Sequence, residues 1–149
     1  RVARHRVGHC ATTGRHIRGE CTVKGDWGTA GQRPVKPGGH EELLAHGPGR
    51  YAGKAIHVTA GHALSLQFHQ AKEETSSCWS GRFAVEVGEH ESSLEEFDLL
   101  PGESIHLRPG VRHRVTALVN SVFLEASTTQ LDDVVRLEDK YGREGTSAP

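Results

Sequence analysis

Four polar side chains in the middle of the chain are of the types that hold a metal ion. Gln67 and His69 are two residues apart, Glu74 follows shortly after them, and His113 lies further along. Together they offer one amide oxygen, two imidazoles and one carboxylate, a donor set that suits a first-row divalent cation. Because a single carboxylate leaves such an ion with net positive charge, the site would be able to polarise an oxygen atom of a substrate.

The pattern of side chains around the first two of these groups predicts a strand. In an extended chain, Gln67 and His69 point to one face, whereas Leu64, Leu66 and Phe68 point to the other. Burial of the apolar face does not require a polar pair opposite it. The pair is therefore interpreted as the start of a metal site.

A short hairpin is expected to bring the fourth group to the same place. The turn signals Pro101-Gly102 and Pro109-Gly110 bracket a short strand, and His113 follows the second turn. In a small barrel, this hairpin would place His113 beside the other three ligands.

Short apolar or alternating runs separated by turn signals recur from about Arg33 onward. They predict strands at Ala55–Val58, Ala63–His69, Arg82–Val87, Phe97–Leu100, Ser104–Leu107, His113–Val119 and Val122–Ala126. Many short strands at such spacing indicate an all-β sandwich or barrel. Residues 130–140 fit a helix, but their Val134, Val135 and Leu137 fit a strand equally well.

The length of the chain, 149 residues, predicts one folded domain. We place this domain at residues 34–143, between tails at 1–33 and 144–149. Residues 1–33 hold seven Lys/Arg and two Asp/Glu, a net charge of +5, whereas the remainder carries −6. A basic arm that binds nucleic acid is one interpretation, and a disordered tail is the favoured one, so no nucleic-acid partner is expected.

Other global features bear on the compartment. No apolar run approaches the ~20 residues of a membrane span, and no signal-peptide pattern is apparent, so no membrane partner is expected. Three cysteines, an odd number, predict no disulfide framework. A cytoplasmic location is the simplest expectation.

The arrangement of glycines and ligand-type residues resembles a known family. The spacing of Gly61, His69, Glu74 and Gly81, followed by Gly102, Gly110 and His113, resembles the two motifs of the cupin superfamily. The first motif usually has His where this chain has Gln67. Within the cupins, the segment LSLQFH resembles the mannose-6-phosphate isomerase branch, in which Gln takes that ligand position.

The closest likeness is to the C-terminal isomerase domain of bifunctional mannose-1-phosphate guanylyltransferase/phosphomannose isomerases. It is also carried by Lys36-Pro37-x-Gly39, by residues 110–114 (GVRHR) and, most specifically, by residues 132–143 (DDVVRLEDKYGR). The likeness covers roughly residues 34–143. The nucleotide-transferase domain of those proteins has no counterpart here.

This resemblance implies a double-stranded β-helix, or jelly-roll barrel, with a divalent metal. Zinc is the metal that it favours, with manganese, cobalt or iron as alternatives, and the ligands would be Gln67, His69, Glu74 and His113. It further implies aldose–ketose isomerisation of a sugar phosphate through an enediol, a step in carbohydrate metabolism and polysaccharide biosynthesis. A homodimer is compatible with such a barrel.

Position in the matching motifs also suggests which cations would contact the substrate. Lys72 and Arg136 are the candidate catalytic residues, and Lys36, Arg112 and Arg143 are the candidate substrate-binding residues, because a phosphate group is held well by arginine. Two other readings stay open. Lys72 fits a surface charge equally well, and Arg136 and Arg143 fit ion pairs with Glu138 or Asp139.

The sequence departs from the family pattern at several positions. Gly38 replaces a tryptophan of the family, Arg108 stands where the second motif usually has proline, and the strand after Glu74 contains the polar run Ser76-Ser77. Buried polar groups in a strand need hydrogen-bond partners. Two alternative functions therefore remain: a sugar-binding cupin without catalysis, and an iron oxygenase that uses only two histidines and one carboxylate.

Overall fold

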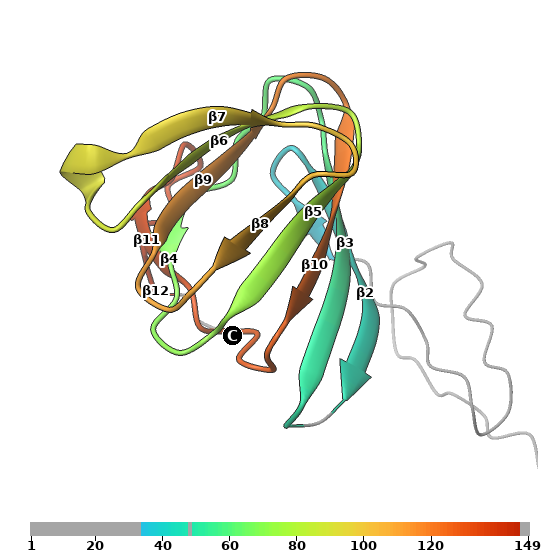
Figure 1. Cartoon of the computed structure of the whole chain (residues 1–149), viewed down its shortest axis with the longest axis vertical. Helices are drawn as coiled ribbons and strands as arrows, with labels where there is room; N and C mark the ends of the chain where they lie inside the picture. Colours follow the sequence, from blue (N-terminus) through green and yellow to red (C-terminus); the bar gives the residue numbers. More distant parts are fainter. Residues whose placement is uncertain (1–33, 48, 147–149) are drawn as a thin grey trace, which may run out of the picture. The chain divides into compact units, whose positions relative to one another are not determined.

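The computed structural model describes residues 34–47 and 49–146, which belong to one compact unit. These residues form two antiparallel six-stranded sheets that face each other (Figure 1). The prediction of an all-β jelly-roll fold is confirmed. The basic tail predicted at 1–33 lies outside the described residues.

The first sheet has the strand order β1-β2-β3-β10-β5-β8. Its strands are β1 (Val35–Lys36), β2 (Gly39–Gly47), β3 (Tyr51–Val58), β10 (Ser121–Ser127), β5 (Glu74–Ser80) and β8 (Ser104–Leu107). Strand β10 lies between β3 and β5, so segments far apart in the sequence become neighbours.

The second sheet has the order β12-β11-β4-β9-β6-β7. Its strands are β12 (Gly145–Thr146), β11 (Val135–Glu138), β4 (Leu66–Phe68), β9 (Arg112–Ala117), β6 (Phe83–Gly88) and β7 (Glu95–Leu99). A short 3-10 turn, Glu91–Ser93, connects β6 to β7. Strand β4, which carries Gln67, thus lies between β11 and β9.

An apolar core fills the space between the two sheets. Phe83, Val85 and Leu107 are its largest fully buried side chains, and Phe83 packs edge-on against Phe123 with ring centroids 5.4 Å apart. Burial of each such side chain stabilises the fold by about 1.5–3 kcal/mol. This core fixes the separation of the sheets, and hence the positions of the polar groups that share their inner faces.

The polar strand β5 is accommodated by alternation. Cys78 points into the core, where it is 2% exposed, whereas Thr75 and Ser77 point outward. On that outer face, Ser77 Oγ lies 2.7 Å from Ser104 Oγ, and Thr75 Oγ1 lies 3.2 Å from Nδ1 of His106. The hydroxyl groups of Thr75 and Ser77 therefore find partners across the β5–β8 pair.

The strands expected from alternation agree with the structure to within a few residues, with some differences. Leu64 precedes β4 and packs against the core, so the prediction that it lies opposite Gln67 was wrong. The ambiguous segment 130–140 contains the strand β11 and no helix. Strand β12 pairs with β11 at Gly145 and Thr146, just beyond residue 143.

Gly38 occupies the turn between β1 and β2. Its φ is +75°, a region that favours glycine, and a Cβ atom there would lie 2.4 Å from Cγ of His62. The turn in this chain thus requires glycine.

The part of the chain that the structure describes contains no helix with the length and hydrophobicity needed to span a membrane.

Candidate metal centre

Strand register brings the predicted ligands together from both sheets. Gln67 on β4 pairs directly with His113 on β9, so their side chains share one face. His69 follows the end of β4 and Glu74 begins β5 in the opposite sheet. The backbone N–H of Gly110 donates to the carbonyl of His69 at 2.7 Å, which ties the turn before β9 to the end of β4.

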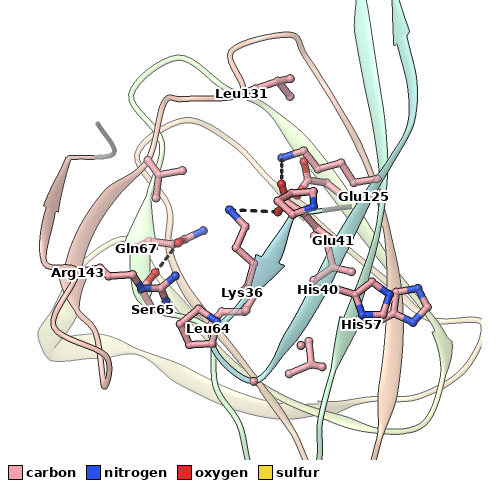
Figure 2. Close-up of a pocket in the computed structure, with 18 of the residues that line it drawn as sticks. Lys36, His40, Glu41, His57, Leu64, Ser65, Gln67, Glu125, Leu131 and Arg143 are labelled. Atoms are coloured by element: carbon pink, nitrogen blue, oxygen red, sulfur yellow. Dashed lines mark hydrogen bonds and ion pairs between the residues drawn. The ribbon is translucent and has the colours of Figure 1, made fainter. Parts of the chain in front are cut away.

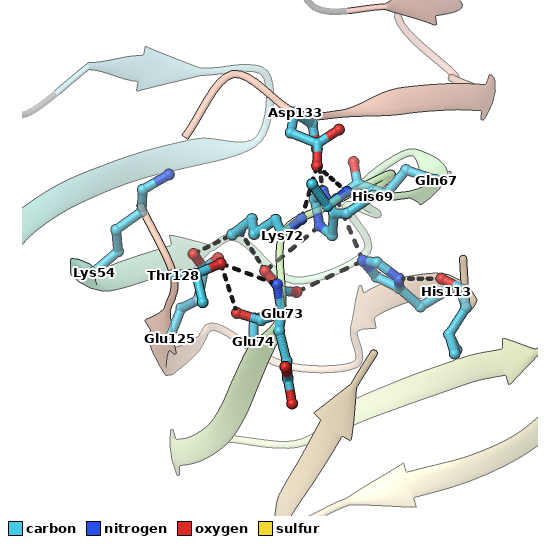
Figure 3. Close-up of polar contacts among 12 residues, drawn as sticks. Lys54, Gln67, His69, Lys72, Glu73, Glu74, His113, Glu125, Thr128 and Asp133 are labelled. Atoms are coloured by element: carbon cyan, nitrogen blue, oxygen red, sulfur yellow. Dashed lines mark hydrogen bonds and ion pairs between the residues drawn. The ribbon is translucent and has the colours of Figure 1, made fainter. Parts of the chain in front are cut away.

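His69, Glu74 and His113 form a buried triad. Their exposed fractions are 2, 5 and 4%, and one ligand atom from each lies within 4.8 Å of the others. Nε2 of His69 is 3.5 Å from Glu74 Oε2, and Nε2 of His113 is 3.7 Å from Glu74 Oε1 (Figure 3). The two imidazole rings are tilted by 39° with centroids 5.3 Å apart.

The outer nitrogens of both imidazoles are held by backbone carbonyl groups. Nδ1 of His69 contacts the carbonyl oxygen of Asp133, and Nδ1 of His113 lies 3.1 Å from that of Val111. When Nδ1–H donates to a carbonyl, Nε2 carries a lone pair, which is the arrangement of metal-bound histidine. Both lone pairs then face the carboxylate of Glu74.

Such a group of acceptors calls for a cation. In the described part of the chain, Nε2 of His69 is buried without a hydrogen-bond partner. Burial lowers the pKa of His113 and outweighs the opposing charge of Glu74, so this imidazole is neutral, as a ligand must be. Burial raises the pKa of the Glu74 carboxyl, but the contact with His69 and the charge of Lys72 bring it well below its usual range. The donor set therefore fits a divalent metal.

Lys72 is buried next to the triad. Its ammonium contacts Glu74 Oε2 and lies 2.8 Å from Glu125 Oε1, and only 3% of the residue is exposed. Burial lowers the pKa of Lys72, but the two carboxylates raise it by more than burial lowers it. The pKa is therefore above its ordinary value, and the ammonium stays charged. Of the two interpretations left open for Lys72, the surface charge was wrong.

Gln67 is held in place by its neighbours. Ser65 Oγ donates to Gln67 Oε1 at 2.7 Å, and Gln67 Nε2 lies 3.4 Å from Nε2 of His113. Ligation through Oε1 requires a half-turn of the amide, after which Nε2 would donate to Ser65. The position of Gln67 fits the predicted ligand role in this second orientation.

Asp133 shapes the loop between His69 and Glu74. Its carboxylate accepts hydrogen bonds from the backbone N–H groups of Gln70, Ala71 and Lys72, at 3.0, 2.6 and 2.8 Å. Its own carbonyl oxygen orients His69. One residue thus fixes both the loop and the imidazole.

Gln67, His69 and Lys72 line a cavity of about 790 Å³. Figure 2 shows Gln67 at the wall of this cavity. Arg136 pairs with Gln67 across β11 and β4 and lines this cavity together with Arg143. Burial and the nearby charge of Arg143 lower the pKa of Arg136. Two guanidinium groups therefore lie at the same wall of the cavity as Gln67.

Arg143 also forms the ion pair that the sequence left open. Its Nε lies 2.7 Å from Asp139 Oδ2, and its guanidinium lies 5.4 Å from the ring centroid of Tyr141. Asp139 is fully buried at its side chain. This pair positions Arg143 while leaving it at the cavity.

The other two predicted substrate-binding cations differ from each other. Lys36 lines the cavity, and its Nζ lies 3.8 Å from Oε2 of Glu41. Arg112 alternates with His113 on β9, and its guanidinium lies over the ring of Phe68 at 4.9 Å and donates to the carbonyl of Gly110 at 2.7 Å. Arg112 does not line the cavity. The structure therefore separates Arg112 from the remaining candidates.

Sequence reasoning missed Glu125 and Asp133 as members of the site. Glu125 lies on β10 among apolar residues. It is two residues from Phe123, which is in the core, so the two side chains share the inward face of the strand. Asp133 was part of the specific segment 132–143, but nothing in that segment indicates which backbone groups it binds.

Comparisons with known proteins bear on the fold. No protein-family model matches the chain, and no curated protein is significantly similar in sequence. Among solved structures, the capsular polysaccharide assembling protein CapF of Staphylococcus aureus matches with a TM-score of 0.66 and 17% identity, over 76% of this chain and 33% of that one. This chain therefore spans about a third of the length of CapF.

Two further structures show the same fold. Oxalate decarboxylase from Bacillus subtilis matches with a TM-score of 0.63 and 16% identity, over 72% of this chain and 30% of that chain. KdgF from Halomonas sp. matches with a TM-score of 0.57 and 21% identity, over 70% and 92% of the two chains. At these identities the likeness concerns architecture alone. The chain has the cupin fold and carries a buried His69–Glu74–His113 triad that is able to hold a metal ion.

Proposed function

We propose that this protein is a divalent-metal-dependent cupin that isomerises a sugar phosphate, of the mannose-6-phosphate isomerase type. The observation that supports this most is that two arginines, Arg136 and Arg143, line the same cavity as His69. Metal ligands and an anion-binding pair at one cavity match the two ends of a phosphorylated sugar.

The metal would be held by Gln67, His69, Glu74 and His113. When bound, it would supply a positive charge that stabilises the oxyanion formed as the substrate passes to an enediol. Zinc suits this set because imidazole and carboxylate ligands are its usual partners, and manganese, cobalt and iron remain alternatives.

The residues of the chain would perform the remaining tasks. Arg136 and Arg143 hold the phosphate, and Lys36, at the opposite wall formed by β1, contacts the sugar. Lys72 is the candidate for proton transfer. Its ammonium, held by Glu74 and Glu125, would protonate the carbonyl oxygen of the substrate, and the amine so formed would take the proton from the neighbouring carbon.

The test is an assay of the purified full chain. Metal content is measured first, and then the interconversion of mannose 6-phosphate and fructose 6-phosphate, with deuterium uptake from heavy water at the carbon that exchanges its proton. We expect metal-dependent turnover. A protein that holds metal but neither binds nor converts a sugar phosphate would refute the proposal.

Two variants separate the metal from the phosphate contacts. His113→Ala is expected to lower metal affinity by about a hundredfold or more, because a buried ligand is lost. Arg136→Ala is expected to leave the metal in place and to raise KM by about tenfold or more, because one charge-assisted contact to phosphate is removed. Arg108→Ala is the matched control, since Arg108 forms an exposed ion pair with Glu89 and does not line the cavity.

An iron oxygenase is the second candidate, and the orientation of Gln67 favours it. With Nε2 turned toward His113, Gln67 is not a ligand, and the triad alone is a two-histidine, one-carboxylate set with open positions. Stoichiometric iron with oxygen uptake would support this function. Sugar binding without turnover or oxygen uptake would instead support a non-catalytic cupin.

A further inference from the structure

A second group of ligand-type side chains lies on strands β2 and β3, away from the buried triad. His40 on β2 pairs directly with His57 on β3, and Glu42 follows His40 by two residues, so the three side chains share one face of the sheet. One ligand atom from each lies within 4.8 Å of the others.

The distances within this group are compatible with the ligands of one metal ion. Nε2 of His40 is 3.4 Å and Nε2 of His57 is 3.6 Å from the same oxygen, Oε1 of Glu42. The two imidazole rings are stacked nearly parallel, with centroids 4.2 Å apart and planes 11° apart (Figure 2). Both Nε2 atoms thus lie at distances from one carboxylate oxygen that suit ligands of one first-row metal ion. Because stacked rings direct their in-plane lone pairs side by side, one imidazole would turn about its Cβ–Cγ bond to bind the same ion.

This face is the outer one. Ile56, the residue before His57 on β3, belongs to the core, so alternation directs His57 and its partner His40 to the opposite face of the sheet. His40 and His57 are part of the lining of the large cavity and also border a shallow depression of about 230 Å³. The side chains of His40 and His57 are 38 and 36% exposed, so an ion can reach them from solvent.

We propose that His40, Glu42 and His57 form a second binding site for a divalent first-row metal ion such as zinc. Two imidazoles and one carboxylate supply three ligands, and water or a group from another molecule fills the remaining position. The ion links β2 to β3 near the edge of the first sheet. Because it binds the folded chain, it stabilises that chain in proportion to its concentration.

The charge balance supports the same site. Two imidazoles and one carboxylate carry at most one negative charge between them when the imidazoles are neutral, and a divalent ion is attracted to all three groups. The alternative is that protonated imidazoles share Glu42 as a surface ion pair, which would bind no metal. A surface ion pair of this kind contributes little to stability.

The experiment uses the full chain, freed of metal, and titrates it with zinc by calorimetry. The variants His57→Ala and His113→Ala each test one site, and His46→Ala is the matched control, because His46 is an exposed histidine on the same strand β2. Residues 1–33 also contain two cysteines and three histidines. The readout is therefore the loss of zinc relative to the unmodified chain, not the absolute number of ions.

We expect His57→Ala to lose one zinc equivalent that His113→Ala and His46→Ala retain. In a parallel spectrum of imidazole nitrogens, zinc added to His113→Ala should shift the Nε2 signals of His40 and His57. The proposal is overturned if His57→Ala binds as much zinc as His46→Ala, or if those Nε2 signals do not respond. Loss of zinc from His113→Ala alone would refute this second site and leave the function proposed for the buried one intact.

Discussion

Two groups of the same composition, two histidines and one glutamate, occur in opposite surroundings of this barrel. His69, Glu74 and His113 are at most 5% exposed, whereas His40 and His57 are each more than a third exposed. The buried imidazoles are oriented by backbone carbonyls, that of Asp133 from a distant loop for His69 and that of Val111 from the adjoining turn for His113. The exposed ones are placed by the register of two adjacent strands alone.

The comparison shows how burial changes the electrostatic interactions of the same three ligand types. In the buried group, low dielectric strengthens attraction to a metal and makes an unpaired charge costly. In the exposed group, water screens the same charges and replaces a lost partner. We therefore expect the buried region to respond strongly to single substitutions and the exposed region to respond weakly.

The largest effect on stability is expected from Lys72→Ala in the metal-free protein. The substitution removes the ammonium between Glu74 and Glu125 and leaves two buried carboxylates without it. Breaking a buried pair in this way lowers the free energy of unfolding by about 3–5 kcal/mol. Urea denaturation measures it, and zinc should restore part of the loss because it neutralises Glu74. Unchanged stability would contradict our description of the buried region.

A smaller effect is expected from Asp133→Asn. The variant keeps the backbone carbonyl that orients His69 but weakens the acceptor for three backbone N–H groups, so we expect a loss of about 1–3 kcal/mol at neutral pH. Denaturation at pH 7, with Asp132→Asn as the neighbouring control, measures this difference. Equal losses in the two variants would mean that the three hydrogen bonds are not the cause.

The same residue predicts a dependence on pH. Burial raises the pKa of Asp133, but the three N–H groups outweigh it and lower the pKa below its ordinary value. The stabilisation by Asp133 is thus fully present above the ordinary value of about 4 and is lost as the pH falls through the lower, folded value. The gap in stability between Asp133→Asn and the unmodified chain should narrow in that acid range. A difference in stability that grows as the pH falls would contradict the lowered pKa of Asp133.

The smallest effect is expected from His57→Ala without metal. Its imidazole is partly exposed and its contact with Glu42 is at the surface, so the free energy of unfolding should change by no more than about 0.5 kcal/mol. Thermal unfolding with and without zinc sharpens the comparison. The unmodified chain should gain stability with zinc that His57→Ala does not. A large loss in the free energy of unfolding in the absence of zinc would contradict the expectation that the exposed region responds weakly to single substitutions.

The sequence predicted the fold because its signals were local. Alternation at Ala55–Val58 or Val122–Ala126, and the Pro-Gly turns around β8, depend only on near neighbours, and they indicated an all-β barrel. Leu64 was misplaced because it precedes β4, where the period of two does not yet apply. The strand at Val135–Glu138 stayed ambiguous because its pairing with β4 is a long-range property.

The site was predictable in its ligands and not in its environment. Types and spacing singled out His69, Glu74 and His113, which the structure brings together. The contacts of Glu125 with Lys72, and of Asp133 with the loop at 70–72, depend on how β10 and the following loop pack. The group of His40, Glu42 and His57 was also missed, because only the pairing of β2 with β3 places the two histidines opposite each other.

The most direct test of the metal centre is a crystal of the full chain grown with zinc, measured at the zinc absorption edge. We predict an anomalous peak among His69, Glu74 and His113, about 2.0–2.1 Å from both Nε2 atoms, with Gln67 turned so that Oε1 faces the ion. A map with no peak there, in which the ammonium of Lys72 still contacts Glu74 and zinc is bound elsewhere, would contradict the account.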